Sequence, residues 1–265
     1  MPELPEVETV TRELLHLKGD VFKAVKAHWP KSLECGEAEF KKKVVKHKIK
    51  KVFRRGKYIC FEFENGYFLT IHLRMTGKVL FECSERDKNY NRVEFNLEKH
   101  GKLYFVDIRK FGRISLWKPD SFLPNLGPEP LEQGVVFKAL KAHKGSREIK
   151  KVLLDQKILA GVGNIYADEA LFQARIHPEK SVPDVSSQKL KKLSEVLPVI
   201  LENSINLMGT TLSDYRNTRN IGGENQNYLK VYGQENEPCL ECGTKIKRIV
   251  IGQRSSHFCP KCQKK

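Results

Sequence analysis

The sequence lacks the features of a membrane-spanning or secreted protein. No apolar run approaches the roughly 18 residues that a spanning helix requires. The first ten residues, MPELPEVETV, carry acids where a secretion signal has a basic region and an apolar core. The cysteine count, seven, is odd, and a reducing compartment argues against disulfides. We therefore expect a protein of the cytoplasm or nucleoid with no membrane partner.

Negative charge is also scarce. Asp and Glu total 32 against 48 Lys and Arg, which leaves a net charge of +16. Such an excess favours a polyanionic partner, because each neutralised phosphate releases condensed counterions. The alternative is a soluble protein with an unusually basic surface. We find no internal repeat and no low-complexity tract, and 265 residues suffice for one large domain or two ordinary ones.

The first part of the chain predicts one helix and then strands. Val7, Val10, Leu14 and Leu17 recur at helical spacing, and Gly19 is placed to end that helix. The period then changes to two, which is typical of half-buried strands. A β-rich body, with its strands packed as a sandwich, is therefore expected after the helix.

The strands themselves are marked by their turns. Asn65-Gly66 separates two alternating runs, 58–64 and 67–73, and this dipeptide between such runs is a strong hairpin signal. Further strands are expected at 93–97, 103–108 and 114–117.

The second part of the chain predicts helices. A short helix is expected near Ile149, a second from Asn164 to about 176, and a longer one over 187–208 with Pro198 inside it. Residues 210–230 are polar and aperiodic, so we expect a mobile loop there. The fold class is therefore α+β with two domains. The expected boundaries are a catalytic sandwich domain at 1–125, a linker at 126–137, a helical DNA-binding domain at 138–230 and a zinc finger at 231–265.

Four cysteines near the C-terminus form the strongest pattern that can be read without any comparison. Two CxxC pairs are separated by 16 residues: Cys239, Cys242, Cys259 and Cys262. Paired thiolates at this spacing predict a tetrahedral Zn²⁺ site. Four protein ligands leave no open position, so the single zinc ion should be structural. A redox pair or two disulfides are the alternatives.

A glycine-rich turn precedes Asn164. It lies between two expected helices, with Lys150 nearby, and Asn164 can cap the second helix. A helix N-terminus attracts anions such as phosphate. Glycine between helices is more often only a turn, so this pattern alone decides nothing.

Proline follows the initiator methionine. Removal of Met1 would expose the secondary amine of Pro2, and an α-amino group titrates near about 7.7–8.0, so a neutral fraction exists at neutral pH. Such an amine can attack an aldehyde-like carbon and form an iminium, with Glu3 beside it as an acid or base. Many proteins begin Met-Pro without any such chemistry.

The whole chain, however, resembles the formamidopyrimidine-DNA glycosylase family. The similar motifs occur in the family's order: MPELPEVET, RRGKYI (54–59), IHLRMTG (71–77), DIRKFG (107–112), LGPEPL (126–131), GVGNIYADEALF (161–172), VYG (231–233) and QRSSHFCPKCQ (253–263). The resemblance implies a helix-two-turn-helix element in the C-terminal domain, a zinc-bound β-hairpin, and a bacterial DNA-repair enzyme that works as a monomer.

The resemblance also implies roles at the catalytic centre. Pro2 attacks C1′ of the damaged nucleotide, and Glu3 protonates the sugar ring oxygen. Lys57 acts near the damaged base and its phosphate. Arg254, at the tip of the zinc hairpin, contacts DNA and assists the last elimination. These groups would excise oxidised purines (8-oxoguanine and formamidopyrimidines) and cleave the strand by β,δ-elimination. No organic cofactor is implied.

A second set of residues is implied to hold duplex DNA. His72, Lys150 and Asn164 hold the backbone. Met75, Arg109 and Phe111 fill the gap left by an everted nucleotide, as intercalating side chains do in other proteins. Tyr90 stands where the family usually has a histidine contact, and it can bond a phosphate instead. As isolated residues, Met75 and Phe111 would be assigned to a core.

The resemblance leaves other functions open. One is the same chemistry on oxidised pyrimidines, as in the sister branch that resembles endonuclease VIII. Others are a catalytically silent damage-binding zinc protein and a zinc-ribbon RNA-binding protein.

Overall fold

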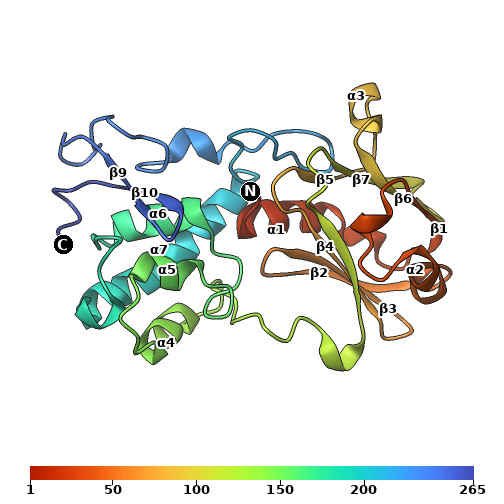
Figure 1. The fold of residues 1–265 in the computed structure, drawn as a ribbon, viewed down its shortest axis with the longest axis horizontal. Coiled ribbons are helices and arrows are strands. Elements are labelled where there is room, and N and C mark those ends of the chain that lie inside the picture. The colour runs from red at the N-terminus through yellow and green to blue at the C-terminus, as the bar shows by residue number, and fades with distance from the viewer. The chain divides into compact units, whose positions relative to one another are not determined.

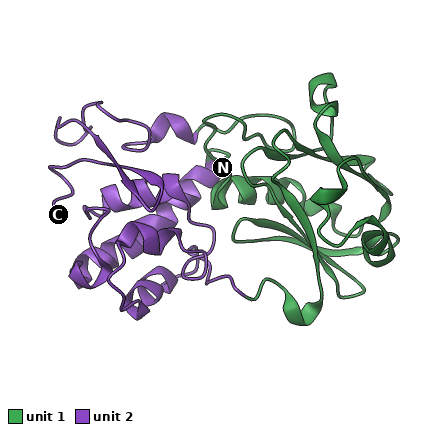
Figure 2. Ribbon diagram, in the orientation of Figure 1, with its two compact units in different colours: residues 1–124, 207–224 green, residues 125–206, 225–265 purple.

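The computed structural model describes residues 1–265 as two compact units (Figures 1 and 2). Unit 1 comprises residues 1–124 and 207–224, and unit 2 comprises residues 125–206 and 225–265. Segment 207–224, expected within the helical domain, therefore belongs to the β-rich unit. No helix has both the length and the apolar character that crossing a membrane requires.

Unit 1 begins with a helix and continues as strands with two short helices between them. Its elements are α1 (Leu4–Glu13), β1 (Phe22–Ala27), α2 (Glu37–Val44), β2 (Ile49–Arg55), β3 (Tyr58–Phe63), β4 (Phe68–His72), β5 (Gly77–Leu80), α3 (Glu85–Lys88), β6 (Asn91–Leu97), β7 (Lys102–Asp107) and β8 (Arg113–Trp117).

The strands of unit 1 form two antiparallel four-stranded sheets. Their orders are β1-β6-β7-β5 and β2-β3-β4-β8. Inward-facing phenylalanines from both sheets meet in one core, where Phe22 lies 5.9 Å from Phe61 and 5.2 Å from Phe95 between ring centroids. Burying side chains of this size drives the sheets together by about 1.5–3 kcal/mol each. The expected α+β fold class is thus confirmed.

The hairpin between β3 and β4 turns at the expected dipeptide. Gly66 has a φ of +82°, and the side chain of Asn65 accepts a hydrogen bond from the Tyr67 N–H at 3.2 Å. Strands β1, β2 and β5 were not expected from the sequence. Strands β1 and β2 each have a register irregularity, between Phe22 and Ala24 and between Ile49 and Lys51, which interrupts the alternation that predicts a strand. Strand β5 has only four residues.

Unit 2 contains four α-helices and one hairpin. They are α4 (Val135–Ala142), α5 (Ile149–Leu154), α6 (Asn164–Gln173), α7 (Ser187–Asn206), β9 (Lys247–Ile251) and β10 (Arg254–Phe258). Helix α4 begins inside the expected 126–137 linker, so that segment is only partly a connection. The long α7 contains Pro198 as expected.

The β9–β10 hairpin has a two-residue turn. Gly252 and Gln253 both have positive φ, +54° and +62°, which matches the twist of the two strands. The hairpin leads to the cysteine cluster, whose small apolar core includes Phe172, Val231 and Ile246. A module with so few buried apolar residues needs a further source of stability.

Candidate active site and nucleic-acid interface

The N-terminal residues lie at the start of α1. Pro2 is buried, Glu3 is 3% exposed and Met1 is 49% exposed. Glu3 is the N-cap of α1, and the Glu6 carboxylate accepts a hydrogen bond from the Glu3 N–H at 2.7 Å. The spacing of Glu3 and Glu6 is that of a capping box. The capping box therefore fixes the backbone of Glu3, the residue bonded to Pro2. Met1 stays accessible for removal.

The β2–β3 turn brings Lys57 to the same unit. An ion pair joins this turn to α1, because Arg54 Nε lies 2.7 Å from Glu8 Oε2. Arg54 also donates to the Gly56 carbonyl at 3.1 Å. Lys57 follows Gly56 and is 7% exposed. The helix that carries Pro2 and the hairpin that carries Lys57 are thus held together by a partly buried charge pair.

His72 lies beside this turn at the end of β4. It is the register partner of Tyr58, and their rings meet edge to face at 4.7 Å. Burial, together with the positive charges of Arg74 and Lys57, lowers the pKa of His72 to about 3. Nδ1 accepts a hydrogen bond from the Arg74 N–H at 3.0 Å. The neutral ring therefore carries its proton on Nε2, which suits donation to a phosphate oxygen.

The depressed pKa of His72 predicts a pH-dependent stability. Between pH 6.5 and about 3 the unfolded chain binds this proton and the folded chain does not. The free energy of unfolding should therefore rise with pH across that window, by an amount of the order of a few kcal/mol. His72→Asn keeps an acceptor for the Arg74 N–H and removes the titration. Urea unfolding from pH 4 to 7 should show a shallower pH slope for the variant; equal slopes would contradict this assignment.

Met75, Arg109 and Phe111 form one exposed cluster. Met75 is 43% exposed and Phe111 47%. Arg109 lies between them: Nη1 contacts Met75 Sδ at 3.2 Å, and the guanidinium carbon lies 4.7 Å from the Phe111 ring centroid. The alternative of core packing is therefore wrong for Met75 and Phe111. An exposed apolar pair around a cation is suited to enter a base stack.

A buried carboxylate organises the loop that carries the cluster. Asp107 is fully buried and accepts hydrogen bonds from the Thr76 hydroxyl, the Arg109 N–H at 3.2 Å and the Gly112 N–H at 2.7 Å. A Cβ at Gly112 would lie 2.4 Å from the Phe105 ring, so only glycine fits there. The DIRKFG motif (107–112) thus includes the two residues, Asp107 and Gly112, that fix the loop conformation around Arg109 and Phe111.

Tyr90 lies near the same loop. Its carbonyl accepts from the Asp107 N–H at 2.9 Å, and the Arg92 guanidinium lies 5.8 Å from its ring. The side chain is half-buried. Tyr90 therefore lies next to Asp107, in the part of unit 1 that would face a DNA strand entered by Met75, Arg109 and Phe111.

Lys150 differs from its expected role. Its side chain is fully buried, and its ammonium donates to the Asp168 carboxylate and, at 3.0 Å, to the Asn164 carbonyl. A buried ammonium requires such a partner because an uncompensated charge is costly. In this structure Lys150 therefore positions the start of α6 and presents no charge to a ligand.

Asn164 also differs, because it does not cap α6. The N-cap is Gly163, and Asn164 is the first helical residue. Its Nδ2 donates to the Ser255 carbonyl at 2.9 Å, while its Oδ1 is buried without a hydrogen-bond partner. Asp168 adds a second link by accepting the His257 N–H at 3.0 Å. Unit 2 thus joins the α6 N-terminus to β10, the strand that begins with the exposed Arg254.

The VYG motif has a structural explanation. Glu169 Oε1 accepts three backbone N–H groups, from Lys230 at 3.1 Å and from Val231 and Tyr232 at 2.9 Å each. Burial nevertheless raises the pKa of Glu169. This carboxylate attaches the chain entering the cysteine cluster to α6.

The four cysteines meet as expected. Their Sγ atoms all lie within 4.8 Å of one another, with 3.9 Å between Cys239 and Cys262 and 3.4 Å between Cys242 and Cys259. A tetrahedron of Zn–S bonds of about 2.3 Å has edges of about 3.8 Å, so the donor set fits one Zn²⁺ ion. Arg175 is paired with Glu241 and lies within hydrogen-bonding reach of Cys262.

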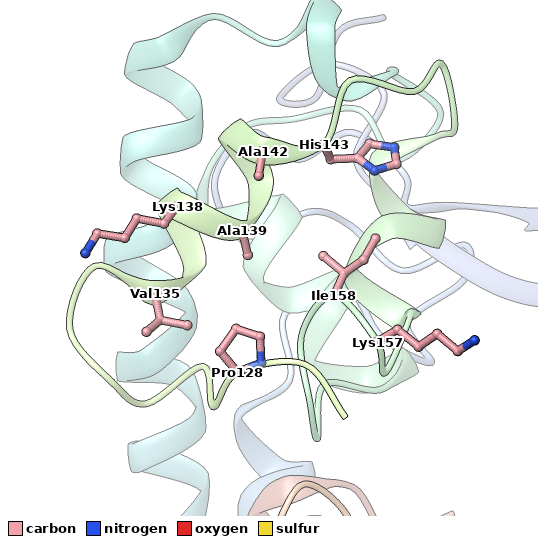
Figure 3. A pocket seen from close by; sticks show the side chains of 8 residues that line it. All are labelled: Pro128, Val135, Lys138, Ala139, Ala142, His143, Lys157 and Ile158. Carbon is pink, nitrogen blue, oxygen red and sulfur yellow. The ribbon is translucent and has the colours of Figure 1, made fainter. Parts of the chain in front are cut away.

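One cavity in unit 2 is lined by other residues. A cavity of about 460 Å³ lies beside α4 in unit 2, with Lys138, His143 and Lys157 around an apolar floor (Figure 3). None of the expected catalytic or DNA-contacting residues lines it: Pro128, Val135, Lys138, Ala139, Ala142, His143, Lys157 and Ile158. This cavity is therefore not part of the candidate site.

Three carboxylates were not singled out in the sequence. Glu6, Asp107 and Asp168 each hold backbone groups next to a candidate residue. Only Glu6 has a local signal, its capping-box spacing from Glu3. The partners of Asp168 are up to 89 residues away, so no local pattern reveals them.

Comparison with known protein families covers most of the chain. Residues 1–114 match the formamidopyrimidine-DNA glycosylase N-terminal domain, and residues 126–216 match the formamidopyrimidine-DNA glycosylase H2TH domain. Residues 236–265 match the zinc finger found in FPG and IleRS. With the geometry above, this shows that the cysteine cluster is a structural zinc site.

Individual relatives are similar over their full length. The formamidopyrimidine-DNA glycosylase of Herpetosiphon aurantiacus is 43% identical, covering 99% of this chain and 100% of the relative. That of Bacillus subtilis is 40% identical, covering 100% of both. The Lactococcus lactis Fpg structure with abasic-site DNA superposes with a TM-score of 0.88 at 36% identity, covering 99% of this chain and 100% of that one.

A structure of MutM (Fpg) from Thermus thermophilus gives the same TM-score, 0.88, at 37% identity, covering 99% of this chain and 98% of that one. The matched family models begin at residue 1 and end at residue 265. This chain belongs to the formamidopyrimidine-DNA glycosylase family.

Proposed function

We propose that this protein is a base-excision-repair enzyme, a DNA glycosylase and abasic-site lyase that removes oxidised purines from duplex DNA. The observation that carries the proposal is the pairing of Pro2 with a buried Glu3 at the start of α1, attached through Glu8 and Arg54 to the Lys57 hairpin. The names of full-length relatives support the same activity.

The chemistry follows from a free N-terminal amine. Once Met1 is removed, the lone pair of the Pro2 nitrogen attacks C1′ and the damaged base leaves with its bonding electrons and a proton. Glu3 donates a proton to the ring oxygen as the sugar opens to an iminium. The iminium accepts electrons when a proton leaves C2′ and the 3′ phosphate is expelled, and a second elimination expels the 5′ phosphate. Water then releases Pro2.

The remaining residues would hold the DNA. Met75, Arg109 and Phe111 occupy the gap of the everted nucleotide, with Arg109 donating hydrogen bonds to the orphaned base. His72 Nε2–H, Tyr90 and Asn164 bind the backbone, and Lys150 acts by positioning the α6 N-terminus. Arg254 reaches DNA from the zinc hairpin.

The biological setting follows from the same argument. The +16 charge suits a duplex partner, and the named relatives are bacterial. We propose that the enzyme works as a monomer in the bacterial cytoplasm, at the nucleoid.

The proposal is tested by borohydride trapping. A labelled duplex with 8-oxoguanine opposite cytosine should yield a covalent adduct with the wild type, and the adduct should fall sharply with Pro2→Gly, which replaces the secondary amine by a primary one. An adduct on abasic DNA but not on 8-oxoguanine would keep the lyase and move the lesion class to oxidised pyrimidines; one structure of the Lactococcus lactis protein holds an oxidised pyrimidine. No adduct with either duplex would leave a silent DNA-binding protein.

A further inference from the structure

Helix α4 has two apolar faces, and only one of them is packed in the core. Val136 and Leu140 are buried, at 1% and 0% exposure. Val135, Ala139 and Ala142 recur at helical spacing on another face, and all three line the cavity of about 460 Å³. Val135 and Ala139 are half-buried and Ala142 is exposed. The rest of the chain therefore leaves this second apolar face partly open to solvent.

The other walls of the cavity are held in place by the backbone. Pro128 comes from the segment before α4, and Ile158 from the turn after α5 (Figure 3). The Pro128 carbonyl accepts the Ala160 N–H at 3.0 Å, and the Gln156 carbonyl accepts the Gly127 N–H at 2.8 Å. A Cβ at Gly127 would lie 2.7 Å from the carbonyl carbon of Ile158, so the two segments are in close contact. The cavity is thus a preformed hollow with an apolar floor.

Cationic side chains lie on both sides of this floor. Lys138 extends from α4 on one side and Lys157 from the turn after α5 on the other, and both are exposed (Figure 3). Neither ammonium group makes an ion pair or a hydrogen bond within the protein. His143 also lines the cavity, and its Nε2 is buried without a hydrogen-bond partner. A buried polar atom without a partner is costly, so these groups favour a ligand that supplies acceptors.

The apolar floor and the unpaired cations together select the kind of partner. Duplex DNA offers phosphates but no apolar side group for the floor, because its bases are stacked inside. A small amphipathic anion has one charged end, whereas Lys138 and Lys157 lie on opposite sides of the floor. An acidic peptide with an apolar side chain between its carboxylates fits both features, since its charge is complementary to the two lysines.

We propose that the cavity beside α4 is a docking site for an acidic segment of a partner protein, which inserts one large apolar side chain between Lys138 and Lys157. None of the candidate catalytic or DNA-contacting residues lines this cavity, so docking should leave DNA cleavage unchanged. The inference does not depend on the proposed function, because it rests only on the shape and charge of unit 2.

The experiment measures the fluorescence anisotropy of labelled synthetic heptapeptides mixed with the full-length protein. The probes carry three acidic residues on each side of a central Leu, Phe or Trp, and a fourth peptide has Ser at the centre. At least one apolar peptide should bind about tenfold more tightly than the Ser peptide, because its central side chain leaves water for the cavity floor. Added salt should weaken binding, because it screens the charges of the exposed lysines.

Two variants test where the peptide binds. Lys138→Glu should weaken binding about tenfold, because it places a carboxylate against the acidic peptide. Ala142→Trp should also prevent binding, because it fills the cavity from an exposed position at the end of α4. Lys192→Glu makes the same charge change at an exposed position on α7 and should stay within about twofold of the wild type. Thermal unfolding of each variant should match that of the wild type, and Lys138→Glu carries the test if Ala142→Trp folds poorly.

Four results would overturn the proposal. Equal binding of the Ser peptide and the apolar peptides would show only a general attraction by the +16 charge. Equal weakening by Lys138→Glu and Lys192→Glu would place the peptide elsewhere. Displacement of the peptide by undamaged duplex DNA, or by decanoate as effectively as by unlabelled peptide, would assign the cavity to DNA or to a small amphipathic anion. Finally, no binding of any peptide up to about 1 mM would leave the cavity without this partner.

Discussion

A protein that retains Met1 should neither cut 8-oxoguanine DNA nor form a borohydride-trapped adduct. With Met1 attached, the Pro2 nitrogen is an amide whose lone pair is delocalised into the carbonyl, so it cannot attack C1′. Inserting a lysine between Met1 and Pro2 should prevent removal of the methionine. Since Met1 is 49% exposed, the added residue can extend into solvent without disturbing α1. We expect cleavage to fall at least about 1,000-fold.

The measurement is single-turnover cleavage on 8-oxoguanine and abasic duplexes, with the N-terminus of each preparation established by mass spectrometry. A matched control carries the extra lysine after Lys265. Binding of uncut DNA should remain close to that of the wild type. Cleavage at the normal rate with Met1 in place would show that another amine is the nucleophile, and Lys57, at 7% exposure beside the same turn, would be the first to examine.

Loss of zinc should abolish tight DNA binding while unit 1 stays folded. The cysteine cluster lies in a module with few buried apolar side chains, including Val231 and Ile246. A structural zinc ion contributes about 10–16 kcal/mol to folding such modules. Without it the β9–β10 hairpin loses its shape and Arg254 is no longer held. We expect the affinity for duplex DNA to fall about 100-fold at moderate salt.

The test combines chelation with a variant. Zinc extraction from the wild type should reduce binding in fluorescence anisotropy, and added Zn²⁺ should restore it. Cys259→Ser removes a fully buried ligand and should behave like the extracted protein, whereas Cys35→Ser, outside the cluster, should bind normally. The dependence of affinity on salt should also become shallower, since fewer phosphates are neutralised. Unchanged binding after complete zinc loss would remove the hairpin from the DNA interface.

Local patterns predicted the elements whose signals are short in range. Asn65-Gly66 marked the β3–β4 hairpin, helical spacing marked α1 and α7, and the four-cysteine spacing marked the metal ligands. The hairpin and helix signals depend on residues only a few positions apart. The four-cysteine spacing is specific because few other sequence patterns place four metal-binding thiols in this way. Strands β1 and β2 were not predicted because their irregular register interrupts the alternation, and β5 was not predicted because its four residues are too few to show one.

Side-chain environments were less predictable. Lys150 was expected to hold DNA, yet it is fully buried against Asp168. Asn164 was expected to cap α6, yet its amide bonds to Ser255, 91 residues away. Sequence similarity identifies such residues as important, but charge and position in the chain do not reveal whether they face a ligand or another side chain.

The sequence by itself determined the family, the position of Pro2 behind Met1, and the zinc ligands, because motif order and residue chemistry are properties of the linear chain. Only the tertiary structure decided that Met75, Arg109 and Phe111 form one exposed cluster, and that segment 207–224 belongs with α1. The contacts responsible, such as Glu6 with Thr210 and Glu13 with Thr218, span 204 and 205 residues. They form only when the two sheets and α1 pack together. Packing brings these carboxylates next to backbone N–H groups that are far away in the sequence and that donate to them.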